Sequence, residues 1–233
     1  MGGTVITRGS ALGVIEAMMA DGIIEEQDML RFKSNKIDEY EPEYIRTEME
    51  RWYKTLGIEY ITKQKLALQL PYFTREEIQE AIENDELILC VPKGVSRKQL
   101  GQLFGIDSWA LTDNLIADTT EENDFWFMMK KSQDIEHQDK SGIEVKRIYE
   151  KEGKLGLSLE RYMVFIARLR YLENITPDIK TKVWITRGAY EKKAMLIAGF
   201  DSEMKFSVHG WLKQFHSPYI GGRYVRIVDH HYI

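Results

Sequence analysis

The chain has 233 residues, and 43% of them are hydrophobic, which is enough to bury a packed core. Its 32 basic and 37 acidic residues give a net charge of −5, which argues against general nucleic-acid binding by the whole chain. Since no long apolar run is free of charges and Cys90 is the only cysteine, we expect a soluble cytoplasmic protein that spans no membrane.

The first 70 residues predict two helices and two short strands. A strand is expected at 4–7 and a capped helix over about 10–20. An amphipathic helix should begin at Pro42, where the first helical turn accepts proline, and stop at Gly57. The alternating leucines of 66–70 favour a strand.

Two capping boxes mark the next helices. Thr74 and Ser96 are N-cap residues, and each is followed three positions later by Glu or Gln. The short apolar runs at 87–91 and 125–129 are typical of buried strands. Cys90 lies inside the first run, which predicts a buried and inert thiol.

A nearly all-apolar helix over 157–172 is the predicted core element of the C-terminal part. Ser158 is its N-cap, and its apolar stripe leaves only four side chains for water, among them Arg161 and Arg168. A helix of this kind has to be covered on most of its sides.

Four strands are expected after this helix, at 183–186, 194–198, 205–209 and 224–228. The sequence therefore predicts an α+β protein, with a helix-rich N-terminal part that holds a few strands, and a C-terminal antiparallel sheet packed on one buried helix.

Charge divides the chain unevenly. From Ser158 to the end, 12 basic residues face 7 acidic ones (+5), so the first 157 residues carry −10. The polar stretch 131–156 lies between the two regions. We therefore expect an acidic part over 1–130, a charged connection over 131–156 and a basic part over 157–233, whose surface attracts anions.

The loop 215–223 and its neighbours are the candidate ligand-binding site, because positive charge, glycines, aromatic rings and imidazoles meet there. The candidate residues are His209, Trp211, His216, Gly221, Gly222 and Arg223. Two glycines could let backbone N–H groups converge on an anion beside Arg223. The alternative is a glycine turn that needs positive φ, over aromatic residues that belong to the core.

Residues 97–116 resemble a helix-turn-helix motif, with Gly101 in the first helix and Gly105 at the turn. The expected second helix, 109–117, contains no Lys or Arg. It is therefore poorly suited to DNA phosphates, which favours a structural helix pair.

The C-terminal histidines form the other candidate. His209, His216, His230 and His231 fall in the last 25 residues, and with Asp229 they could bind a divalent metal. No Walker loop, GxGxxG, GxSxG or HExxH motif is present, so the sequence identifies no cofactor.

The leading hypothesis is a non-enzymatic intracellular binding or regulatory protein that recognises a protein partner or an anionic ligand through its basic C-terminal part. The alternatives are a metal-dependent hydrolase that uses the C-terminal histidines, and a DNA-binding regulator that uses residues 97–116.

Overall fold

The computed structural model describes residues 38–114, 116, 121–187, 190 and 193–227, nearly all of them in one compact unit, Tyr40–Ile233. The strand and helix expected at 4–7 and 10–20 lie outside the described residues. The described helices are α3 (Pro42–Thr55), α4 (Ile58–Thr62), α5 (Arg75–Glu83), α6 (Arg97–Phe104), the 3₁₀ turn η1 (Trp109–Leu111), α7 (Gly142–Lys151) and α8 (Leu159–Glu173).

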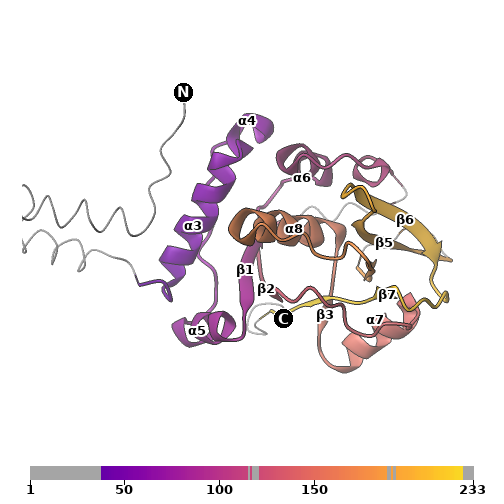
Figure 1. Ribbon diagram of the computed structural model, residues 1–233. Coiled ribbons are helices and arrows are strands. Elements are labelled where there is room, and N and C mark those ends of the chain that lie inside the picture. Colours follow the sequence, from indigo (N-terminus) through magenta and orange to yellow (C-terminus); the bar gives the residue numbers. More distant parts are fainter. Residues whose placement is uncertain (1–37, 115, 117–120, 188–189, 191–192, 228–233) are drawn as a thin grey trace, which may run out of the picture. The chain divides into compact units, whose positions relative to one another are not determined.

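Three small sheets accompany them (Figure 1). The strands are β1 (Glu86–Val91), β2 (Phe125–Lys130), β3 (Leu155–Gly156), β4 (Lys182–Ile185), β5 (Ala194–Phe200), β6 (Phe206–Leu212), β7 (Ile220–Gly221) and β8 (Tyr224–Val225). β1 pairs with β2, β3 pairs with β8, and the third sheet has the order β6-β5-β4-β7. The predicted α+β class is confirmed. The first half of the chain is rich in helices, and the larger sheet lies near the C-terminus.

Helix α8 is the central core element, as predicted, and it lies in the middle of Figure 1. Ser158 caps it by accepting a hydrogen bond from the Arg161 N–H, and its apolar side chains pack against β1 and α6. It also reaches the four-stranded sheet, where the ring centroids of Tyr162 and Phe206 lie 6.0 Å apart. The helix therefore joins the two halves through one shared core.

The prediction that Arg161 and Arg168 face water is wrong. Arg161 is buried because its guanidinium bonds to Glu121 at 2.7 Å and stacks on the Phe125 ring. Arg168 is buried over the Trp52 ring, 5.1 Å from its centroid. The aliphatic carbons and the planar guanidinium of each arginine cover apolar surface. A hydrophobicity pattern treats arginine as polar and therefore does not predict this burial.

The strand predicted at 66–70 is also wrong, although the neighbouring helix α3 forms as expected. Helix α4 follows Gly57, and the next residues to Thr74 form no strand. The backbone N–H of Leu68 bonds to the Glu50 carboxylate, and that of Gln69 bonds to the Asp124 carboxylate. Side chains therefore take the hydrogen bonds that a neighbouring strand would have taken.

The second helix of the helix-turn-helix is not formed in the described residues. Helix α6 ends at Gly105, which has a φ of +63°, and the next helical segment is only the three-residue turn η1. The indole N–H of Trp109 donates to the backbone oxygen of Val208 at 2.8 Å, which ties this turn to the edge strand β6.

The last predicted strand, 224–228, does not join the sheet. Its first two residues form β8, which pairs with β3, and residue 228 lies outside the described part. β7 takes the edge of the sheet instead and pairs with β4 in parallel, while β4, β5 and β6 are antiparallel as expected.

The polar stretch 131–156 contains a helix that the sequence patterns did not predict. Ser141 and Glu144 form a third capping box, and α7 packs its Val145 and Tyr149 against Trp184 of β4. The assignment of 131–156 as a connection between two domains stays a prediction. In the fold, this helix forms one wall of a pocket at the end of the four-stranded sheet.

Candidate functional site

Three of the predicted site residues lie along the exposed edge strand β6 and the loop after it. His209 and Trp211 are in β6, and Trp211 packs edge-on against Phe215 with ring centroids 4.4 Å apart. His216 contacts the first turn of α7, since its Nε2 lies 3.4 Å from the Glu144 carboxylate. These residues therefore gather beside α7.

Gly221 and Gly222 are buried on the other edge of the sheet, three strand spacings from β6. Neither has the positive φ that the turn interpretation required. Glycine is needed because a Cβ at Gly222 would overlap the Tyr149 side chain, and one at Gly221 would overlap the backbone of Glu136. The N–H of Gly222 bonds to the Glu136 carbonyl at 2.7 Å, so it is already engaged.

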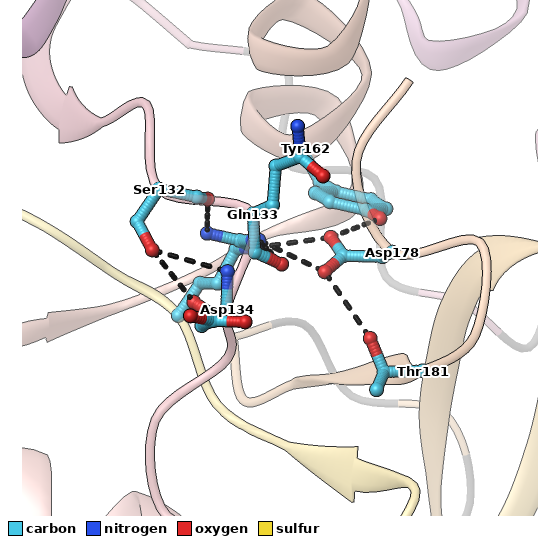
Figure 2. Close-up of polar contacts among 7 residues, drawn as sticks. Ser132, Gln133, Asp134, Tyr162, Asp178 and Thr181 are labelled. Carbon is cyan, nitrogen blue, oxygen red and sulfur yellow. Dashed lines mark hydrogen bonds and ion pairs between the residues drawn. The ribbon is translucent and has the colours of Figure 1, made fainter. Parts of the chain in front are cut away.

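Figure 2 shows a cluster of polar contacts around Asp178. The buried side chain of Arg223 belongs to this cluster. Its guanidinium bonds to both Asp178 oxygens, at 3.0 and 2.9 Å, and to the backbone carbonyls of Ser132 and Gln133. The Tyr162 hydroxyl donates to the same carboxylate at 2.8 Å. Four of the five donors of Arg223 are therefore used inside the protein.

A cavity of about 220 Å³ lies beside Arg223, but its lining is unfavourable for an anion. Three carboxylates border it, those of Glu86, Asp134 and Glu136, whereas Lys130 and Arg223 are its only cations. An anion there would meet more negative than positive charge, and an anion-binding role for Gly222 and Arg223 would require the bonds described above to break.

No metal centre is formed by the residues that the structure describes, because none of them group three or more His, Cys, Asp or Glu side chains suitably. His209 and His216 lie within that part, whereas Asp229, His230 and His231 lie outside it. The role of the last three in metal binding stays a prediction.

A larger pocket, of about 490 Å³, lies between α7 and one end of the four-stranded sheet. The pocket is bounded by the end of β4, the start of β5 and the end of β6. Leu155 and Gly156 of β3 also line it. We call it the basic pocket, because the described residues that line it include four cations and one carboxylate: Lys146, Lys154, Arg187, Lys213 and Glu150.

The four cations differ in what they already bind. Lys154 is engaged, since its Nζ lies 2.8 Å from the Glu152 carboxylate and 4.1 Å from the centroid of the Tyr224 ring. Burial is the largest single effect on the pKa of Lys154 and lowers it, but the hydrogen bond to Glu152 and the charges of Tyr224, Glu136 and Glu152 together hold the pKa above its ordinary value. Lys146 is loosely paired with Glu150, at 3.8 Å.

Within the described part of the chain, Arg187 and Lys213 are the two lining cations without a compensating charge. Neither side chain makes a hydrogen bond or ion pair with any described residue. They are held by their backbones, because the N–H of Arg187 donates to the Leu157 carbonyl and the Lys213 carbonyl accepts from Ile143 in α7. Arg187 follows the end of β4 and Lys213 follows the end of β6, so two segments bring positive charge to one pocket.

A buried hydroxyl on the pocket wall also has no partner among the described residues. Thr186 is 7% exposed, and its Oγ1 makes no hydrogen bond. It lies against Gly156, where any Cβ would overlap it. A buried hydroxyl without a partner costs about 1–3 kcal/mol, so this part of the wall gains from a water or ligand oxygen.

Sequence patterns predicted part of this pocket. They placed Arg187 and Lys213 in the basic part of the chain, but they assigned Lys146 and Lys154 to a polar connection. The Ser141 capping box was the signal that could have revealed α7, which carries Lys146 and ends shortly before Lys154. The two-residue strands β3 and β8 are too short to give a recognisable strand pattern in the sequence.

Comparisons with protein-family models, curated proteins and solved structures found no match to this chain. In the part of the chain that is described, no helix is long and apolar enough to cross a membrane.

Proposed function

We propose that this chain is a non-enzymatic intracellular binding protein that takes an anionic ligand in the basic pocket. The observation that carries the proposal is the pair of uncompensated cations, Arg187 and Lys213, on two strand ends that face one cavity. Charged groups left without partners in a concave site are favourable positions for a ligand of opposite charge.

Electrostatics favours an anion with more than one charge. At an effective dielectric constant of about 20, a unit anion about 4 Å from a cation gains roughly 4 kcal/mol of Coulomb energy before desolvation is subtracted. Arg187 can present a planar fork of donors and Lys213 a point charge. Since both are partly open to water, we expect a dissociation constant of about 10 μM to 1 mM, weakened by salt.

Binding rather than catalysis is supported by the chemistry of the lining. Among the described residues that line the pocket, Glu150 is the only carboxylate and is exposed, and none is a histidine or a cysteine. Burial raises the pKa of Tyr149 far above its ordinary value, so its hydroxyl stays protonated. These groups do not form a general acid and base pair.

The test is thermal unfolding of the full chain with sodium pyrophosphate, against sodium chloride of equal ionic strength. A ligand present at about 100 times its dissociation constant adds roughly 2.7 kcal/mol, which corresponds to an increase in Tm of about 5–10 °C. The double variant Arg187→Gln/Lys213→Gln should lose this increase.

Lys180→Gln is the matched control, because Lys180 is exposed and precedes the opposite end of β4. It should keep the full increase. If pyrophosphate has no effect beyond that of sodium chloride, or if the double variant responds like the wild type, the proposed function is wrong.

A further inference from the structure

Beside the basic pocket lies an exposed aromatic pair that the proposed function does not use. Trp211 is 36% exposed and Phe215 is 40% exposed, and their rings meet edge to face. Single exposed aromatic residues are common, but two that pack together at the rim of a pocket offer a flat apolar surface to a ligand.

The strand register places this pair next to the pocket. Trp211 of β6 is the cross-strand partner of Met195 of β5, and Met195 lines the pocket. Directly opposite residues in a sheet have Cβ atoms about 4.5–5.5 Å apart, on the same face. That face is the one covered by α7, because a Cβ at Gly142 of α7 would contact the Met195 sulfur.

The chain that leaves this strand connects the aromatic ring to a cation. Lys213 comes two residues after Trp211, in the turn that follows the end of β6, and its N–H donates to the Lys193 carbonyl at 3.1 Å. Two residues span at most about 7 Å, so the two positions are close. The chain therefore presents, in order, a ring surface at Trp211 and an uncompensated ammonium at Lys213. A ligand with a flat ring at one end and a negative charge at the other matches this order.

On the basis of the proposed function, we infer that the anion is a nucleotide, whose phosphates lie at Arg187 and Lys213 and whose base stacks on Trp211. Nucleotides combine a polarisable flat ring with several negative charges, joined by a sugar of suitable length. Base stacking on an exposed aromatic residue contributes to affinity with every base, because every base has a π-face.

A mononucleotide fits better than a nucleic-acid strand. The pocket volume of about 490 Å³ lies in the range of small-molecule sites. A strand would need rows of cations along a groove, whereas the described lining of the pocket offers two unpaired cations, on a chain with a net charge of −5.

The experiment compares ADP with pyrophosphate by isothermal titration calorimetry of the full chain at constant ionic strength. The two probes share their phosphate groups, and only ADP has a base. ADP should bind about tenfold more tightly than pyrophosphate if its base stacks. Trp211→Ala should remove this advantage and leave pyrophosphate binding unchanged, while Trp211→Phe keeps part of it.

Tyr60→Ala is the control for loss of an exposed aromatic side chain, because Tyr60 is 79% exposed in α4. It should change neither affinity. Equal affinities for ADP and pyrophosphate in the wild type, or an equal loss of both in Trp211→Ala, would overturn the nucleotide assignment while pyrophosphate binding still supports the basic pocket. Tighter binding of a thymidine decamer than of ADP would overturn it in favour of a strand. If neither ADP nor pyrophosphate binds, the proposed function fails as well.

Discussion

Arg223 and Asp178, 45 residues apart, form a buried ion pair with two hydrogen bonds, and their side chains are only 5% and 0% exposed. The pair connects the segment between β7 and β8 to the loop before β4. Arg223 also holds the loop after β2 through the carbonyls of Ser132 and Gln133. The Arg223 side chain therefore connects its own segment to the loop before β4 and to the loop after β2.

Replacing Arg223 should be strongly destabilising. Arg223→Ala leaves the Asp178 carboxylate buried without its cation, which should cost about 3–5 kcal/mol of unfolding free energy. Arg223→Lys keeps the charge but loses the planar fork, so we expect a smaller loss of about 1–3 kcal/mol. Urea unfolding followed by circular dichroism measures both. A loss below about 1 kcal/mol for Arg223→Ala would show that the pair does not hold these segments.

Arg161→Ala, which the sequence alone predicts to be mild, should cost about 2–4 kcal/mol. The reason is that Arg161 is buried on the Phe125 ring and paired with Glu121, which would lose its cation. Arg170→Ala is the matched control on the same helix, because Arg170 is exposed. It should change stability by less than about 1 kcal/mol in the same urea titration. Equal effects of the two substitutions would contradict the burial of Arg161.

Cys90 should be unreactive in the folded protein. It is fully buried in β1, and burial raises the pKa of its thiol well above the ordinary value, so that less of the reactive thiolate is present at any given pH. Iodoacetamide at about pH 8 should label the chain only after unfolding in urea, as read by mass spectrometry. Rapid labelling without urea would mean that β1 opens readily.

The sequence predicted those features of the fold that depend on local patterns. The boxes at Thr74 and Ser96 and the apolar run after Ser158 each identified a helix that forms, because capping and amphipathicity act over a few residues. The expected strand at 66–70 failed because the carboxylates of Glu50 and Asp124, far away in sequence, bind that backbone.

The candidate site was harder to predict, because it too depends on residues that are far apart in the sequence. The role of Trp211 in a binding site stays a prediction. Arg223 has the same sequence signature as a binding arginine, but its side chain pairs with Asp178 inside the core. Whether an arginine pairs internally depends on where the chain brings Asp178, and no local pattern reports that. Lys213 and Arg187 lie among aromatic residues in the sequence, but only the strand order places both at one end of the sheet.

The most direct test of the basic pocket is a titration of ¹⁵N-labelled protein with pyrophosphate, followed by amide chemical shifts. The account predicts that the largest saturable shifts occur at Gly156, Thr186, Arg187 and Lys213, around the free cations. Saturable shifts centred on Gly222 and Arg223 instead, or no shifts at pyrophosphate concentrations of about 10 mM, well above the expected dissociation constant, would contradict it.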